Sequence, residues 1–414
     1  MDFIRRHKFR PSDFTRHCRL AFDTVVIFLL NLVKGALQRE LDEYFKALSG
    51  DDVAHRVVTK SAFCSARQKL KPSAFVELNE QLIKRLYRQA SIVRWRGLDV
   101  RSVDGTTLRL PDTPELIGFF GQMVPAQGDP VTMARVSQLY DPLNNIVHHS
   151  VMTPYAKDER SLLCEHLSYI HPGSLILLDA GYPAFWLLSL FHSRKLDWCV
   201  RMPLSSWLVV RDFLQTRKSD DIVTLKPSAA MRAECDQHGA PTAPLRVRLV
   251  RVILSTGETE VLMTSLVDRE EYRNEEFSEL YFMRWGHEEH YKRLKSRIEI
   301  ENWSGKSVLT AFQDFYAKVF AMNLTIALTN TAQGIVNVRH AGDKHPKNIN
   351  VTNAYCAMKN TITKLFIRAN PLKIIIDLIN LFADTVEPVR PGRSYPRKKG
   401  PRLHRYSANY KPCT

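Results

Sequence analysis

The chain has 414 residues, of which 44% are hydrophobic and 25% are charged, and its formal net charge at pH 7 is +16. This composition excludes a disordered, collagen-like or low-complexity chain, and the longest apolar run, residues 25–30, is far shorter than the roughly 18 residues that span a membrane. Seven scattered cysteines without a Cys-x-x-Cys pair, and an N-terminus without the features of a secretory signal, predict a protein of the reducing cytoplasm that has no membrane partner.

The excess of positive over negative charge lies at the two ends of the chain. Residues 1–95 hold 18 Lys and Arg against 10 Asp and Glu, and residues 387–414 hold 8 against 1, whereas residues 96–386 hold 33 against 32. Phosphate groups of DNA or RNA are the simplest partner for such ends. A basic helical domain and a solubilising tail explain the same charge without any nucleic acid.

Residues 15–95 have the periodicity of helices. The predicted helices are 21–37, 41–48, 59–70 and 73–87. The third of them is basic, since it carries Arg67 and Lys69 on either side of Gln68. Short helices around a basic helix are typical of a helix-turn-helix DNA reader, although a plain helical bundle gives the same pattern.

From residue 97 the pattern changes to strands that alternate with helices. The predicted strands are 98–110, 131–140, 145–153, 174–178 and 197–202, and the predicted helices are 157–170 and 183–193. This alternation predicts an α/β fold.

Residues 204–268 interrupt that alternation. We expect strands at 207–213, 222–225, 245–254 and 258–265, which together predict an all-β insertion. Helices are then expected at 274–295, 309–329, 351–369 and 372–383. The segment from residue 387 is rich in Pro, Arg and Lys and is expected to be irregular.

Two aspartates lie where predicted strands end. Asp104 is in Val-Asp-Gly-Thr-Thr of the first strand, and Asp179 follows the apolar strand 174–178 and opens Asp-Ala-Gly-Tyr. In α/β sheets, groups at the carboxyl ends of strands face the ligand crevice. Taken alone, each Asp-Gly or Asp-x-Gly motif is more often a turn than a site.

A third acidic residue lies on the long predicted helix 274–295. At about 100° per residue, a stripe roughly 80° wide carries one phenol, one carboxylate and three cations; these are Tyr281, Arg284, Glu288, Lys292 and Lys295. A solvated face with Glu–Lys pairs has this composition. A carboxylate flanked by cations is also what a phosphodiester enzyme needs, because the carboxylate holds a divalent metal while the cations bind phosphates.

The spacing Tyr-x2-Arg-x3-Glu-x6-Lys, formed by Tyr281, Arg284, Glu288 and Lys295, resembles the signature helix of bacterial DDE transposases of the insertion-sequence-four type. The Asp104 and Asp179 motifs resemble the first and second catalytic motifs of that family, in the same order. The resemblance covers about residues 97–330, with a looser likeness in the N-terminal helices.

The resemblance implies an α/β fold with a ribonuclease-H-like catalytic domain, interrupted by the all-β insertion, between an N-terminal helical DNA-binding domain and C-terminal helices. The expected divisions are 1–95 (DNA binding), 96–203 and 269–335 (catalytic), 204–268 (insertion), 336–386 (possible dimerisation) and 387–414 (basic tail).

The resemblance also implies the roles of the site residues. Asp104, Asp179 and Glu288 would be the catalytic ligands of two Mg²⁺ ions, with Mn²⁺ as an alternative. Transposon-end phosphates would be bound by the cationic stripe; these DNA-binding residues are Tyr281, Arg284, Lys295 and, as a weaker candidate, Lys292.

Some neighbouring residues are less suited to the site. Glu289 falls outside the stripe, and Trp285 is expected in the core more than on a base. The His-x2-His spacing of His287 and His290 differs from that of zinc proteases, so no zinc site is predicted. Family members can flip a DNA base onto an aromatic residue of the insertion, but Trp207 is its only tryptophan, and a hairpin intermediate stays open.

The resemblance implies a bacterial, nucleoid-associated DNA transposase. It would bind the terminal inverted repeats of double-stranded DNA, cut there, join the freed 3′-hydroxyl to target DNA, and act as a homodimer that bridges two ends. Two alternatives are a metal-dependent nuclease without strand transfer and a non-catalytic DNA-binding protein descended from a transposase. Arg and Lys interleaved with Tyr make the tail a second DNA contact or plain solvated chain.

Overall fold

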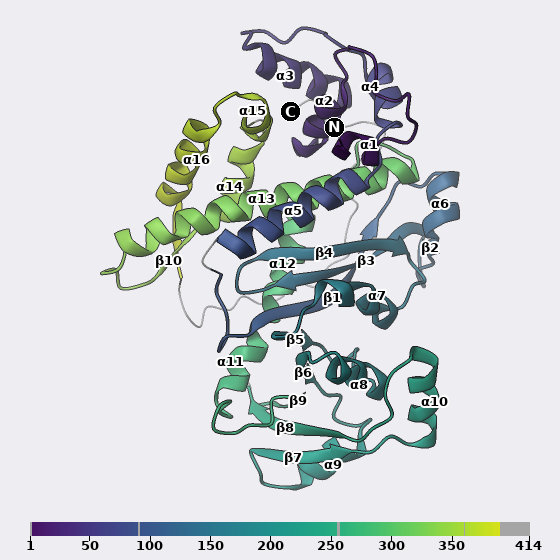
Figure 1. Ribbon diagram of the computed structural model, residues 1–414, viewed down its shortest axis with the longest axis vertical. Coiled ribbons are helices and arrows are strands. Elements are labelled where there is room, and N and C mark those ends of the chain that lie inside the picture. Colours follow the sequence, from purple (N-terminus) through teal and green to yellow (C-terminus); the bar gives the residue numbers. More distant parts are fainter. Residues whose placement is uncertain (1, 90–91, 255–256, 360, 390–414) are drawn as a thin grey trace. The chain divides into compact units, whose positions relative to one another are not determined.

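The computed structural model describes residues 2–89, 92–254, 257–359 and 361–389 (Figure 1). The chain divides into two compact units, each assembled from separate stretches of sequence. Unit 1 comprises residues 1–90, 107–134 and 292–414, and unit 2 comprises residues 91–106 and 135–291. Apart from residues 387–389, the predicted basic tail lies outside the described residues.

Unit 1 is mainly helical. Its helices are α1 Asp2–His7, α2 Phe22–Leu30, α3 Leu37–Ser49, α4 Lys60–Arg67, α5 Ser73–Gln89, α6 Pro114–Phe120, α13 Val308–Arg339, α14 Val351–Met358, α15 Thr361–Ile367 and α16 Leu372–Asp384. The long helix α13 is its central element, and α2, α5 and α16 pack along it (Figure 1). A short antiparallel pair joins β10 Lys347–Ile349 to β11 Val386–Pro388.

Helix α13 starts at a capping box, in which Ser307 and Thr310 satisfy each other's backbone amides. This helix is long and apolar enough to cross a membrane, but 61% of its most apolar 18-residue stretch is buried inside the protein. The core helix of a soluble protein can be equally long and apolar, so the helix is weak evidence for a membrane.

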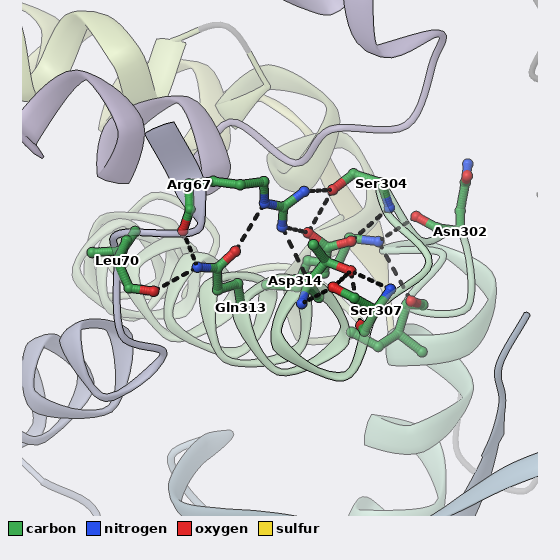
Figure 2. Close-up of polar contacts among 10 residues, drawn as sticks. Arg67, Leu70, Asn302, Ser304, Ser307, Gln313 and Asp314 are labelled. Atoms are coloured by element: carbon green, nitrogen blue, oxygen red, sulfur yellow. Dashed lines mark hydrogen bonds and ion pairs between the residues drawn. The ribbon is translucent and has the colours of Figure 1, made fainter. Parts of the chain in front are cut away.

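A buried polar cluster joins α4 to α13 within unit 1 (Figure 2). Arg67, which is 1% exposed, pairs with Asp314 at 3.0 Å and donates to Gln313 at 2.8 Å and to Ser304 at 2.8 Å. Gln313 in turn donates to the carbonyl of Leu70 at 2.7 Å. The arginine of the basic helix is therefore an internal side chain.

Unit 2 is built on a mixed sheet. Its strands are β1 Asp99–Arg109, β3 Val131–Asp141, β4 Ile146–Pro154, β5 Ser174–Leu178, β6 Asp197–Arg201, β7 Asp220–Leu225, β8 Leu245–Ile253 and β9 Thr259–Thr264. Strands β1 and β3 run on into residues of unit 1, where β2 Gln122–Met123 pairs with β3. The strand order is β2-β3-β1-β5-β6-β9-β8-β7, and β4 also pairs with β3.

Strand β5 lies at the centre of this sheet. All five of its residues are buried, and it pairs in parallel with β1 on one side and β6 on the other. Strands covered on both faces read as continuous apolar runs, which explains the sequence Ser-Leu-Ile-Leu-Leu. The predicted mixed α/β fold is confirmed.

The prediction of an all-β insertion is wrong. Residues 204–268 contain α9 Leu208–Gln215 and α10 Ala229–His238 as well as β7, β8 and β9. The strands extend the central sheet, because β9 pairs antiparallel with β6. The segment 207–213 is helical since Val210 and Phe213, three residues apart, are buried on one helical face.

The remaining helices of unit 2 are α7 Glu159–His166, α8 Phe185–Ser193, α11 Glu276–Phe282 and α12 Trp285–Ser296, whose last turns fall in unit 1. The single helix expected over 274–295 is therefore two helices. At the break the amides of Gly286 and His287 bond to carbonyls three residues back, those of Met283 and Arg284, so the chain makes a tight turn there.

Candidate active site

Asp104 lies within β1, and its carboxylate is largely buried. The side chain is 18% exposed, and Oδ1 accepts the amide hydrogen of Gly105 at 2.8 Å. The carbonyl oxygen of Asp104 is also bonded, because it accepts from the hydroxyl of Tyr291 at 2.7 Å. The carboxylate and the backbone carbonyl of Asp104 are therefore both held by hydrogen bonds.

Asp179 follows β5, the strand that pairs with β1. Its Oδ1 accepts the amide hydrogen of Gly181 at 2.8 Å, which closes a turn around the second motif. Arg160, in the first turn of α7, donates to the carbonyls of Gly181 at 3.1 Å and Pro183 at 3.3 Å. This arginine fastens the turn that presents Asp179.

Glu288 lies in the first turn of α12 and is joined to Asp104 through Arg284. Arg284 Nη2 is 3.0 Å from Glu288 Oε1, and Nη1 is 3.8 Å from Asp104 Oδ2. The guanidinium is buried and also lies over the rings of Tyr281 and Trp285. The signature arginine thus bridges two of the three acidic residues.

The surroundings of Asp104 raise the affinity of its carboxylate for a proton. Burial raises the pKa of Asp104 to about 7, and the nearby Asp179 and Glu159 carboxylates act in the same direction. The amide of Gly105 and the Arg284 guanidinium oppose this shift in the pKa of Asp104. Crowded, desolvated carboxylates are typical of functional sites.

The other predicted DNA-binding residues differ in exposure. Tyr281 is buried, and its hydroxyl donates to the carbonyl of Leu178, the residue before Asp179, at 3.3 Å. In unit 1, Lys292 is exposed, whereas Lys295 is half-buried and donates to the carbonyl of Thr107 at 2.8 Å. The structure thus brings Tyr281 and Arg284 together with the acidic residues inside unit 2.

The acidic residues supply carboxylate oxygens, which are suitable ligands for a divalent cation. Carboxylate oxygens are the donors that Mg²⁺ prefers, and the buried hydroxyl of Tyr182, near these carboxylates, has no hydrogen-bond partner among the described residues. Within the same residues, no three Asp, Glu, His or Cys side chains converge closely enough to hold a metal.

Several residues near Asp104 carry no signal in the sequence pattern. Glu159, in the first turn of α7, reaches the part of β1 that follows Asp104, since its Oε1 is 2.8 Å from where a Cβ on Gly105 would lie. Arg135 on β3 pairs with Glu159 at 2.9 Å. Neither residue lies in a motif, and only the fold brings them to the site.

The side chains that were not expected at the site have other neighbours. Glu289 is exposed and Trp285 half-buried, while Trp207 precedes α9 and packs partly buried against the core of unit 2. His287 is buried, and burial holds its pKa well below the ordinary value, so the ring is neutral. Like His290, it is bonded to the sheet.

A family model described as the transposase DDE domain matches residues 95–324, more than half of the chain. The chain therefore belongs to this family of DDE transposases, which are metal-dependent enzymes that cleave and transfer DNA. The resemblance stated from Tyr281, Arg284, Glu288 and Lys295 is confirmed at the level of the family.

The chain is also similar to the transposase InsG for insertion sequence element IS4 of Escherichia coli (strain K12). The two are 23% identical over 349 residues, which cover 82% of this chain and 76% of that protein. Among solved structures, a piggyBac transposase synaptic complex with hairpin DNA covers 95% of this chain and 84% of its own, with 11% identity and a TM-score of 0.46. That structural likeness is too weak to carry an argument.

Proposed function

We propose that this enzyme binds the terminal inverted repeats of an insertion sequence, cleaves the phosphodiester bonds at the element ends, and transfers the 3′-hydroxyl ends to target DNA. One observation carries the proposal: within unit 2, Arg284 joins Asp104 to Glu288, and Asp179 interacts with Asp104. These contacts support the proposal that the three acidic residues of the motifs act together at one site.

Asp104, Asp179 and Glu288 would hold the two divalent cations, Mg²⁺ by preference. When bound, such cations activate the attacking oxygen and stabilise the leaving one during in-line displacement. The protein itself fixes the carboxylates. The Gly105 and Gly181 amides orient Asp104 and Asp179, and the Arg160 bonds to the backbone hold the turn after β5.

The proposed DNA contacts are Tyr281, Arg284, Lys292 and Lys295. Lys292 is exposed and can meet a phosphate directly. Arg284 has a fork of donors suited to a phosphate, one of which bonds to Glu288 in this structure. Tyr281, buried against the end of β5, would reach only a phosphate drawn in beside Asp179.

A homodimer is proposed for the DNA complex, with one element end for each protomer. Its support is the apolar surface of α15 and α16 in unit 1, where Phe366 is 44%, Leu372 58% and Ile376 49% exposed. Exposed apolar surface of this kind is typical of interaction sites. The same proposal has the enzyme act on DNA of the bacterial nucleoid.

A strand-transfer assay tests the proposed function. A DNA with the element's end already cut to a 3′-hydroxyl is incubated with a plasmid target and Mg²⁺, and joined products are counted. The proposal predicts joining that Asp179→Ala abolishes. Cleavage of uncut ends without any joining would instead indicate a nuclease, and binding without cleavage in any divalent metal would indicate a non-catalytic DNA-binding protein.

A further inference from the structure

One face of α12 is polar although it is buried against the sheet. His287 is fully buried, and His290 and Tyr291 are nearly so. A buried polar group is costly unless it is hydrogen-bonded, so the partners of these three side chains show what the face does. None of the three belongs to the signature, which consists of Tyr281, Arg284, Glu288 and Lys295.

Two of these side chains bond to β1 at Asp104 or within two residues of it. His287 Nδ1 lies 2.9 Å from Ser102 Oγ, two residues before Asp104. The Tyr291 hydroxyl donates to the carbonyl of Asp104 itself at 2.7 Å. Helix α12 is thereby joined to the strand segment that presents Asp104.

The third side chain bonds to the neighbouring strand. His290 Nε2 lies 2.9 Å from Gln138 Oε1 on β3, and the hydroxyl of Ser137, the residue before Gln138, donates to the Asp104 carbonyl at 3.4 Å. The carbonyl of Asp104 is thus held from α12 and from β3. The bond from Tyr291 is the shorter of the two.

Close packing fixes the position of α12 along the sheet. A Cβ on Gly286 would lie 3.4 Å from the Cβ of Pro142, so the helix approaches the end of β3 closely. The ring of Tyr140 packs against His287 and His290 with centroids 5.1 Å and 4.6 Å apart. Rotation or sliding of the helix would break these contacts together with the hydrogen bonds.

Tyr291 is three residues after Glu288 and therefore lies beside it on the helix, about 60° around the axis. We propose that Tyr291 is a positioning residue, whose hydroxyl holds the backbone of Asp104 against the helix that carries Glu288 and so sets the spacing of the two carboxylates. This inference rests on the proposed assignment of Asp104 and Glu288 as metal ligands. Residues that orient metal ligands typically contribute about 10- to 100-fold to metal affinity or activity.

The test compares Tyr291→Phe with Tyr140→Phe. Each substitution removes one buried tyrosine hydroxyl of unit 2, but Tyr140 donates to Asn145 at 2.9 Å, in the turn between β3 and β4. Thermal melting, Mn²⁺ binding by calorimetry, DNA affinity, and kcat and KM for end cleavage are measured for both variants and for the wild type.

We expect the two variants to melt within a few degrees of each other. Tyr291→Phe alone should bind Mn²⁺ about 10-fold more weakly and lose about 10-fold in kcat, with KM and DNA affinity unchanged. Equal metal affinity and kcat in the two variants would overturn the inference. If Tyr291→Phe also melts far below Tyr140→Phe, the hydroxyl has a general structural role and the inference is likewise wrong.

Asp104→Ala, measured in parallel, separates this inference from the proposed function. If Asp104→Ala abolishes cleavage and Mn²⁺ binding while Tyr291→Phe equals the wild type, only the positioning role fails. If Asp104→Ala cleaves and binds Mn²⁺ normally, the assignment of the metal ligands fails first.

Discussion

Gly105, the residue after Asp104, has no room for a side chain. A Cβ there would lie 2.8 Å from Oε1 and 3.0 Å from Cδ of Glu159. Glu159 is not free to swing away without loss, because Arg135 holds its carboxylate at 2.9 Å. The glycine of the first motif therefore lets a fourth carboxylate approach Asp104.

We predict that Gly105→Ala lowers the free energy of unfolding by about 1–3 kcal/mol, the usual cost of overpacking. Most of this loss should disappear when Glu159→Ala is present, so that the double variant is nearly as stable as Glu159→Ala alone. Denaturant unfolding of the four proteins in a double-mutant cycle measures this coupling. An equal cost of Gly105→Ala with and without Glu159 would show that the clash does not exist.

His149 should make the stability of unit 2 depend on pH. Burial lowers the pKa of His149 to about 4, and its Nδ1 lies 2.8 Å from that of His166. The unfolded chain takes up this proton near pH 6.5 and the folded chain only near pH 4. The contribution is therefore complete above pH 6.5 and is lost as the pH falls toward 4, by roughly 3 kcal/mol at most.

Unfolding measured between about pH 7.5 and 4 tests this expectation. His149→Gln should lose less stability on acidification than the wild type, and the difference should grow as the pH falls from 6.5 toward 4. Parallel curves for His149→Gln and the wild type would contradict it.

At the scale of elements, helix α4 and the two residues after it divide their polar side chains between two tasks. Arg67 points inward to Asp314 and Gln313, as Figure 2 shows, whereas Gln68 and Lys69 are exposed. If this basic segment contacts DNA, Gln68 and Lys69 make the contact. Arg67 instead holds α4 on α13.

We predict opposite effects for two substitutions in this segment. Arg67→Ala should cost about 3–5 kcal/mol of stability, because it leaves the buried Asp314 carboxylate without its partner. Lys69→Ala should change stability by less than about 0.5 kcal/mol but should weaken DNA binding. Chemical unfolding and DNA titrations at several salt concentrations measure both effects. Weaker DNA binding by Arg67→Ala at unchanged stability would contradict this division.

The elements also show how far the sequence could predict the fold. The apolar run of β5 and the helical period of α16 depend on local pattern, and both were predicted within a residue or two. Helix α9 was mistaken for a strand because the β-propensity of Val209 and Val210 outweighed the helical spacing of Val210 and Phe213. The local choice there depends on which face the rest of unit 2 covers.

The site was predictable only in part. The spacing of Tyr281, Arg284 and Glu288 is visible in the sequence, but the break at residues 283–284 and the burial of Arg284 between two carboxylates are not. Tyr291 and Glu159 reach Asp104 through tertiary packing alone. The sequence pattern can reveal residues with an unusual spacing. The residues that contact them in space are known only once the fold is known.

At the scale of the whole molecule, the excess charge is at the ends of the chain. Of the residues from 387 onward, 8 are Lys or Arg and 1 is acidic. Each phosphate contact contributes about 0.9 to the slope of log affinity against log salt for duplex DNA, so deleting residues 390–414 should make the slope less steep by about 2 or more. An unchanged slope and affinity would mean that the tail does not bind DNA.

The central claim is that Asp104, Asp179 and Glu288 form the catalytic centre of a DNA transposase. Its most direct test is the cleavage, in Mg²⁺, of a DNA that carries the element's own end, by the wild type and by Asp104→Ala, Asp179→Ala and Glu288→Ala. The wild type should cut at the end, and each variant should bind this DNA without cutting it. Normal cutting by any one of the three variants would contradict the claim.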